Sequence, residues 1–315
     1  MSNTRVLLKA RRVPQLLAAI NGFDKRVLAA YREAIRRFGH KPWVTGVTIG
    51  IKERGGELRR DVGPVITIHV VRKIASRRVR PSRRIPRKML GIPTDVVGGR
   101  FVRSTGAGGM AVAGPSLKSG DSISRVGQAA GTFGAVIRRG NTRFLLSAGH
   151  VLRSGGVAAG RPIVHPASGD SPPPSTVVAR LTTFNLDQDA AIGEIEAGVD
   201  PSNTARSTGV AIGSPKWAAQ DDILELNGRT TAIARGVVTQ VGLVQGLYPA
   251  IALRPLPGDP LPITQGGDSG AIWYDATTAA AKGLHVGIKK ATGESLAVML
   301  PAVLAEMPGG PFVWW

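Results

Sequence analysis

The chain has 315 residues, with 41 lysine and arginine residues against 21 aspartate and glutamate residues, and it contains no cysteine. The missing cysteines exclude disulfides and thiolate metal sites, and no segment approaches the roughly 20 apolar residues of a membrane span. The amino terminus lacks the apolar core of a signal peptide, so we expect a cytoplasmic protein. Abundant glycine and proline, 41 and 22 residues, indicate many turns and short strands rather than a helical bundle.

The positive charge is concentrated in the first third of the chain. Residues 1–103 carry 25 basic and 6 acidic side chains, whereas residues 104–315 carry 16 and 15. A change of this size indicates a domain boundary, and the glycine-rich stretch after residue 103 is typical of a linker. We therefore expect a basic α+β domain at 1–103, a linker at 104–112 and a second domain at 113–315.

The first domain shows the patterns of one helix and two strands. Apolar residues at helical spacing predict a helix that ends near Gly39, and two alternating runs separated by a glycine turn predict a hairpin. The apolar positions are Val27, Leu28, Tyr31 and Ile35 in the helix, Trp43, Val47, Ile49 and Ile51 in the first strand, and Ile66, Ile68 and Val70 in the second.

Residues 72–88 hold too many cations and prolines for either kind of element, so we expect an exposed basic loop. Such a loop could bind nucleic acid or another polyanion by neutralising phosphates. The alternative is an ordinary solvated surface, since no base-stacking aromatic residues are interleaved with the cations.

From Val112 onward the pattern becomes that of an all-β protein. Short apolar runs are separated by turns rich in glycine and proline; they lie at residues 132–137, 143–147, 191–195, 232–238 and 284–288. About 200 residues of this kind suit two small antiparallel barrels packed together. The predicted fold class is therefore mostly β, preceded by a small α+β domain.

The string Gly-Asp-Ser-Gly, around Ser269, occurs once in the chain. A serine hydroxyl attacks well only when an imidazole takes its proton, and that imidazole needs a carboxylate to fix its tautomer. His150 ends one apolar strand and Asp189 precedes another, so both are placed at strand ends where they could meet the serine. These three residues predict a nucleophilic site.

Other residues of the same types remain as alternatives. Asp187 is the rival for the acid, because alternation puts it on the same strand face as Asp189. His165 is a weaker candidate for the base. Two further Gly-Asp-Ser triplets end at Ser122 and Ser171, but both lie before Asp189 and neither is followed by glycine.

Three segments occur in a familiar order. Ser-Ala-Gly-His150-Val, Asp189-Ala-Ala-Ile and Gly-Gly-Asp-Ser269-Gly resemble the histidine, aspartate and nucleophile boxes of trypsin-like serine proteases. The resemblance implies a double Greek-key β-barrel of the chymotrypsin type, with Ser269 as nucleophile, His150 as general base and Asp189 as its orienter. It also implies an oxyanion hole formed by the backbone N–H groups of Gly267 and Ser269, and no metal or organic cofactor.

The resemblance covers about 200 residues, and it extends to smaller features. Segments 43–52, 91–97 and 131–134 look like bacterial relatives of the plant narrow-leaf proteases. Gly149 stands where the animal digestive members of the trypsin-like family usually have alanine. No activation site is present, so Asp268, which pairs with a newly cut amino terminus in zymogen members, needs another internal partner. We therefore expect a protein that is competent without proteolytic maturation.

In this family the specificity pocket is lined by the residue five positions before the nucleophile and by the strand after it. Those positions are Thr264, His285, Val286 and Gly287. The threonine and histidine resemble the pocket of bacterial glutamyl endopeptidases, which holds a carboxylate. The alternative is that His285 only fills the barrel and that the pocket takes small apolar groups. The pocket base position holds Ile263 rather than an aspartate, which argues against a preference for lysine or arginine.

The sequence therefore predicts a serine endopeptidase that acts on a protein or peptide through an acyl-enzyme. The alternative is a catalytically idle protease-like scaffold that binds a partner or a polyanion through its basic first domain.

Overall fold

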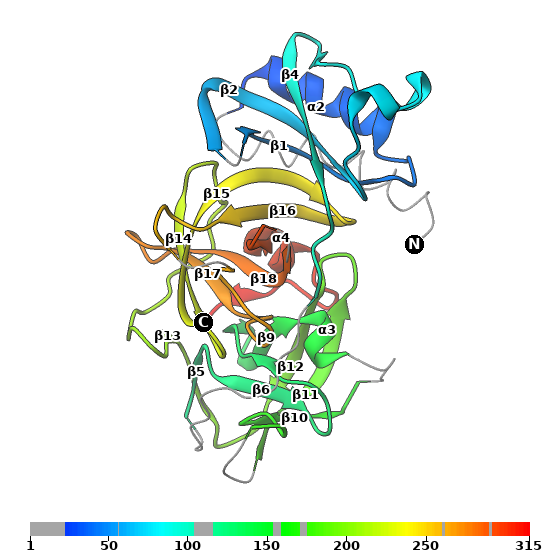
Figure 1. Cartoon of the computed structure of the whole chain (residues 1–315). Helices are drawn as coiled ribbons and strands as arrows, with labels where there is room; N and C mark the ends of the chain where they lie inside the picture. Colours follow the sequence, from blue (N-terminus) through cyan, green and yellow to red (C-terminus); the bar gives the residue numbers. More distant parts are fainter. Residues whose placement is uncertain are drawn as a thin grey trace. The chain divides into compact units, whose positions relative to one another are not determined.

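The computed structural model describes seven ranges of the chain (Figure 1). They are residues 23–55, 57–103, 116–153, 159–170, 175–259, 262–289 and 292–315, and the side chain of Ser76 is not among them. The predicted linker, residues 104–112, lies outside these ranges. Internal contacts divide the chain into two units, one built mainly from Met1–Phe101 and the other mainly from Val102–Ala218 and Leu253–Trp315.

The first unit is a sheet with one helix packed on it. Its strands are β1 (Val44–Arg54), β2 (Glu57–Val70), β3 (Lys88–Met89), β4 (Ile92–Gly98), the second half of β15 (Ala232–Val244) and most of β16 (Leu247–Arg254). They lie in the order β16-β15-β1-β2-β4-β3. β1 and β2 pair antiparallel, as the predicted hairpin requires, whereas β2 and β4 are parallel. The connection from β2 to β4 contains the basic segment 72–88.

Helix α2 (Lys25–Phe38) forms where the apolar spacing predicts it. The carboxylate of Asp24 accepts a hydrogen bond from the backbone N–H of Arg26 at the start, and the helix ends at Gly39. Tyr31 on its buried face donates to the Val47 carbonyl at 3.1 Å and accepts from the Leu243 amide at 3.1 Å. Burial raises the pKa of the Tyr31 hydroxyl well above its usual value, so it remains a donor.

This unit also takes in residues 238–252, which the sequence boundary assigned to the second domain. The reason is backbone pairing: Gly46–Gly50 on β1 lie opposite Gln240–Val244 on β15. Tyr31 adds a side-chain link to the same strand. A boundary placed by charge alone therefore misses the strand that completes the first unit.

Residues 72–88 form two short 3-10 turns, η1 (Ser76–Arg78) and η2 (Pro81–Arg83), followed by β3. The cations of this segment are exposed, as predicted; they are Arg72, Lys73, Arg77, Arg78, Arg80, Arg83, Arg84, Arg87 and Lys88. Contact of this surface with a polyanion stays a prediction.

The second unit contains an eight-stranded sheet that curls into a half-barrel. Its strand order is β20-β8-β9-β12-β11-β10-β6-β7. The bounds are β6 (Ser122–Arg125), β7 (Gly131–Thr132), β8 (Ala135–Arg139), β9 (Thr142–Ala148), β10 (Pro162–His165), β11 (Thr176–Asn185), β12 (Ala190–Ile195) and β20 (Val313–Trp314). Beside it, β5 (Ser116–Ser119) and β13 (Asp200–Ala205) form a parallel pair.

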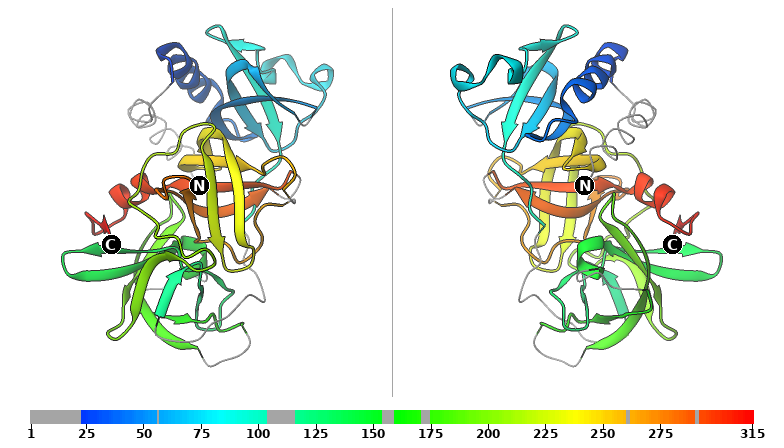
Figure 2. Two further views of the ribbon diagram at one scale, coloured as in Figure 1. Left: turned by 90° about the vertical axis from the view of Figure 1, so that its left-hand side faces the viewer. Right: turned by 90° about the vertical axis from the view of Figure 1, so that its right-hand side faces the viewer.

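Six strands close into a barrel in the order β14-β17-β18-β19-β16-β15, because β14 pairs with both β17 and β15. Their remaining bounds are β14 (Ile223–Gly228), β17 (Ile272–Asp275), β18 (Ala281–Lys289) and β19 (Glu294–Met299). Helix α4 (Leu300–Glu306) packs against β18 and β19 (Figure 2). This mostly β fold, with one closed barrel and one curled half-barrel, confirms the predicted chymotrypsin-type architecture. No helix in the described ranges is long and apolar enough to cross a membrane.

Candidate active site

Strand register brings His150 and Asp189 to the same place. β9 and β12 pair antiparallel so that Ala148, the last residue of β9, lies opposite Ala190, the first residue of β12. His150 follows the end of β9 in the short helix α3 (Gly149–Leu152), and Asp189 immediately precedes β12. Both side chains therefore leave the same end of one strand pair.

The Asp189 carboxylate holds His150 by two hydrogen bonds. Its Oδ1 accepts from the His150 backbone N–H at 2.9 Å, and its Oδ2 lies 2.8 Å from the imidazole Nδ1. The Asp189 side chain is only 4% exposed. Because an ionised carboxylate can only accept, the Nδ1 must carry the proton, which leaves a lone pair on Nε2. That Nε2 is buried and has no hydrogen-bond partner within the described ranges.

The geometry distinguishes the aspartates and histidines that the sequence left open. Asp189, rather than Asp187, is the carboxylate that His150 contacts. Asp189 adopts a φ of +50°, a left-handed backbone conformation that is uncommon for a residue other than glycine. His165 is buried elsewhere, with its Nδ1 2.8 Å from the carbonyl oxygen of Ser122.

Gly149, the residue before His150, lies very close to Asp189. A Cβ on Gly149 would lie 3.0 Å from both the carbonyl carbon and the Oδ1 of Asp189. The Gly149 amide also donates to the Asp189 carbonyl at 2.6 Å. The close approach of Asp189 therefore leaves little room for the alanine methyl group that the animal digestive members of the resembled family usually have.

Ser269 lies in a tight loop directly before β17, in the same unit. Two glycines shape this loop, Gly267 with a φ of +103° and Gly270 with a φ of +99°. A Cβ on Gly267 would meet Thr230 Oγ1 at 2.3 Å. Thr132 binds the loop from the other barrel, since its amide donates to the Ser269 carbonyl at 2.8 Å and its hydroxyl donates to the Gly267 carbonyl at 2.8 Å.

The predicted oxyanion donors lie on this loop. No hydrogen bond from the Gly267 amide to an acceptor in the described ranges is present. The Gly267 carbonyl is occupied by Thr132, which fixes the orientation of the loop. Ser269 itself is 1% exposed.

Asp268 has the internal partner that the sequence did not identify. Its Oδ1 accepts from the amides of Thr230 and Thr231 at 2.9 and 3.0 Å. Its Oδ2 accepts from the Gln265 amide at 2.8 Å and from the Thr231 hydroxyl. These donors satisfy a fully buried carboxylate without any amino terminus.

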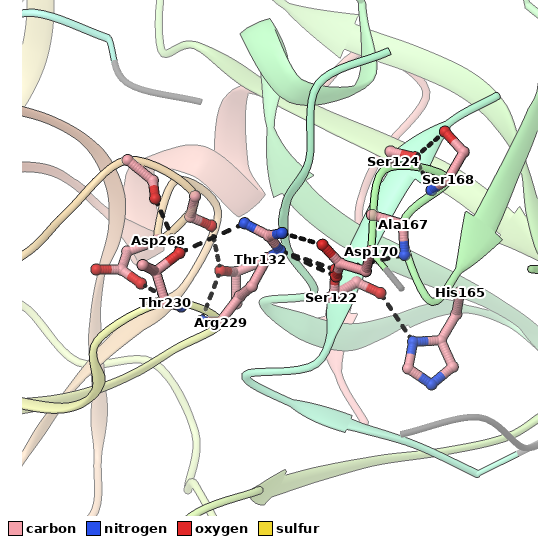
Figure 3. A network of polar contacts seen from close by, with 12 residues as sticks. Ser122, Ser124, Thr132, His165, Ala167, Ser168, Asp170, Arg229, Thr230 and Asp268 are labelled. Atoms are coloured by element: carbon pink, nitrogen blue, oxygen red, sulfur yellow. Dashed lines mark hydrogen bonds and ion pairs between the residues drawn. The ribbon is translucent and has the colours of Figure 1, made fainter. Parts of the chain in front are cut away.

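A buried ion pair supports the same loop (Figure 3). The guanidinium of Arg229 and the carboxylate of Asp170 form an ion pair, and both side chains are fully buried. Arg229 Nε also donates to the Ser122 hydroxyl at 2.9 Å, and that hydroxyl donates to Asp170. Ser122, the end of another Gly-Asp-Ser triplet, is thus part of a buried polar network; Ser171 lies outside the described residues.

The predicted pocket residues are buried, and Thr264 and His285 each have a hydrogen-bond partner. Thr264 Oγ1 lies 2.6 Å from the hydroxyl of Ser295. The His285 Nδ1 accepts from the indole N–H of Trp273 at 3.4 Å. Burial, with a smaller contribution from the electrostatic interaction with His150, lowers the pKa of His285 to about 3. The imidazole is therefore neutral at ordinary pH. Val286 is also buried, and Ile263 supplies an apolar side chain.

The described residues contain no group of three or more histidine, aspartate or glutamate side chains placed to hold a metal ion.

The candidate site offers an imidazole, a carboxylate that orients it and a serine on a loop held by hydrogen bonds. Several contributors had no sequence signal of their own. Thr132, Thr230 and Thr231 are ordinary β-strand and turn residues, and only their hydrogen bonds reveal their part.

No protein-family model and no curated protein matches the chain. Several solved structures are similar in fold. Protease A of Thermobifida fusca has 17% identity and a TM-score of 0.45, covering 60% of this chain and 95% of that one. A glutamic acid-specific serine protease with a histidine triad in substrate binding has 19% identity and a TM-score of 0.48, covering 63% and 100%. A Cellulomonas bogoriensis chymotrypsin has 16% identity and a TM-score of 0.43, covering 60% and 95%.

All of these are chymotrypsin-fold serine proteases, and by its own strand topology this chain has the same class of fold. At such identities the activities and substrates of those proteins remain properties of those proteins.

Proposed function

We propose that the chain is a serine endopeptidase in which Ser269 is the nucleophile, His150 the base and Asp189 the residue that orients it. The observation that carries the proposal is the pairing of His150 Nδ1 with Asp189 Oδ2 at 2.8 Å, which leaves the Nε2 lone pair without a partner within the described ranges. An imidazole held in this tautomer is suited to take a hydroxyl proton.

The chemistry follows the acyl-enzyme route. Ser269 Oγ bonds to the carbonyl carbon of the scissile peptide while its proton passes to His150 Nε2. The amides of Gly267 and Ser269 donate to the resulting oxyanion, each donor being worth about 3 kcal/mol in such sites. His150 then gives the proton to the departing amine, and a water molecule hydrolyses the ester by the same steps in reverse.

The loop geometry supports these roles because it is rigid before substrate arrives. Asp268 is held by its donors and Thr132 fixes two carbonyls of the loop, so the amides need no reorganisation during reaction. No amino terminus is required for this arrangement. The protein should therefore be competent without proteolytic maturation.

A fluorophosphonate probe tests the proposal directly. We expect it to label the full-length protein at Ser269, and we expect Ser269→Ala to abolish the labelling. The matched control is Ser207→Ala, an exposed serine, which should label like the original protein. Labelling that survives in folded Ser269→Ala protein, or none in the folded original protein, would contradict the assignment.

The pocket is proposed to take uncharged side chains. With a pKa near 3, His285 presents no positive charge to a carboxylate at neutral pH. The Thr264 hydroxyl is already paired with Ser295. Peptide substrates that differ only in Glu or Gln at the cleaved position should therefore be turned over without a preference for Glu. A Glu preference that disappears in His285→Gln would show instead that the imidazole reads a carboxylate.

A further inference from the structure

One edge of β18 is only partly covered by other strands. β19 runs along one edge of β18, from Gly283 to Lys289. Along the opposite edge, β17 pairs with β18 only as far as Leu284. Just beyond, the amide of Gly270 donates to the His285 carbonyl at 2.9 Å, so the loop that carries Ser269 lies against this edge. The remaining part of the edge is not covered by β17 and is therefore open to pairing with an extended segment.

That remaining part is occupied by the chain itself. Val102 and Ile288 form an antiparallel bridge in which each backbone N–H donates to the other's carbonyl, at 2.7 and 3.0 Å. Gly287 permits the close approach, because a Cβ there would lie 2.8 Å from the Val102 carbonyl oxygen. Val102 and β18 belong to the same unit.

The direction of this pairing leads toward the candidate active site. In an antiparallel pair, residues that follow Val102 lie opposite residues that precede Ile288, which is the direction of His285 and the nucleophile loop. Arg103 is the next residue. Its Nε lies 2.9 Å from Oδ2 of Asp189, the oxygen that also binds His150.

The contact joins opposite charges at a position that water still reaches. The Asp189 carboxylate is 4% exposed, whereas the Arg103 side chain is 53% exposed. A side chain that exposed is held weakly and can be replaced by a similar cation. Backbone pairing at Val102 together with one cation against Asp189 is the mode of contact expected of an extended basic peptide.

We propose that Val102 and Arg103 act as an intramolecular pseudosubstrate: they occupy the β18 edge where an extended substrate binds, and Asp189 selects a basic side chain at the place of Arg103. The inference rests on the proposed protease function in so far as the bound peptide is called a substrate. Binding of the peptide does not itself require catalysis. The preferred ligand is thus a peptide with a basic residue next to an apolar one in extended conformation. A tethered occupant of this kind lowers the apparent affinity for outside peptides.

Peptide binding to the full-length Ser269→Ala protein tests the proposal without turnover. The probe is a fluorescent peptide of sequence Gly-Gly-Arg-Phe-Val-Arg, which copies residues 98–103. We expect the additional change Arg103→Gln to tighten binding of this peptide, and Val102→Pro with Arg103→Gln to tighten it at least about tenfold, since the internal competitor is lost. Val102→Pro removes the N–H that donates to Ile288.

Two controls make the result specific. Arg100→Gln changes an exposed arginine three residues away and should leave the affinity unchanged. A probe peptide that ends in Gln instead of Arg should lose most of the gain, because Asp189 then has no cation to bind. Equal affinity across all variants, or equal binding of the two peptides, would overturn the proposal.

Kinetics separate this role from a merely structural one. With Ser269 intact, Arg103→Gln should lower KM for extended peptides and leave kcat almost unchanged. A fall in kcat with unchanged KM would assign Arg103 to orienting Asp189 instead and would also overturn the proposal. If the fluorophosphonate test fails while peptide binding responds as expected, the protease function is wrong and the pseudosubstrate contact stands.

Discussion

The two halves of the candidate site are held in different ways. His150 and Asp189 are placed by the backbone of two paired strands, and they contact each other directly. The loop around Ser269 is placed by side chains from distant segments, chiefly Thr132, Thr230 and Thr231. Local apolar alternation predicts the two strands, whereas the hydrogen bonds that hold the loop come from residues far apart in sequence. The first half therefore depends on the pairing of two strands, and the second half depends on individual side chains from distant segments.

The strongest test of the strand-held half compares its two aspartates. Asp189→Asn removes the acceptor that fixes the His150 tautomer, and we expect kcat for a peptide substrate to fall roughly 10,000-fold. Asp187→Asn is the matched control and should stay within a few-fold of the original, because the imidazole and the amide of His150 are both bonded to Asp189. Steady-state kinetics on proteins with unchanged melting temperatures decide between them. Equal losses in both variants would mean that the wrong aspartate has been assigned.

The strongest test of the loop concerns its left-handed glycine. Gly267→Ala places a methyl group 2.3 Å from Thr230 Oγ1 and 2.5 Å from an Arg229 nitrogen, at a φ of +103°. The loop must shift, so we expect kcat/KM to fall roughly 100- to 1,000-fold, the loss typical of a displaced oxyanion donor. Gly140→Ala is the control, since its φ is also positive but no atom lies within 4 Å. Activity that survives Gly267→Ala would show that the observed geometry of this loop is not needed.

The smallest expected effect concerns His285, which adjoins both halves. Its folded pKa is about 3, below the ordinary 6.5, so in acid the unfolded chain takes up a proton that the folded protein refuses. This contribution to stability is complete above about pH 6.5 and is lost as pH falls toward 3, by about 1.4 kcal/mol per pH unit. The free energy of unfolding in urea, measured for the original protein and for His285→Gln between about pH 3 and 6.5, gives the size of this contribution. Identical pH dependence in the two proteins would contradict the burial of a neutral imidazole.

The elements with strong local patterns were predictable from the sequence. The helix around Tyr31, the hairpin of β1 and β2 and the barrel fold all follow from apolar spacing and turn residues. His150 and Asp189 were found for a related reason, because each adjoins an apolar strand that the local pattern predicts.

Other features could not be predicted because their partners are distant. Asp268 binds Thr230 and Thr231, nearly 40 residues away, and no periodicity links them. Arg103 was counted only as part of a basic domain, although it contacts Asp189. The continuation of β15 to Val244 was missed because its partner, β1, lies almost 200 residues earlier. Local patterns predict which residues are strands, and they do not predict which strand will be the neighbour.

The pairing of β1 with β15 has a consequence for how the protein is made. Gly46 leaves the ribosome about 200 residues before its partner Val244, which at 5 to 20 residues per second is a wait of roughly 10 to 40 s. During that time one edge of β1 has no strand beside it, and its apolar residues Val47 and Ile49 are next to open backbone groups. The nascent chain is then most prone to pair with another copy of itself. Faster translation, or a chaperone that covers the edge, should raise the soluble yield more than any change in the finished protein's stability.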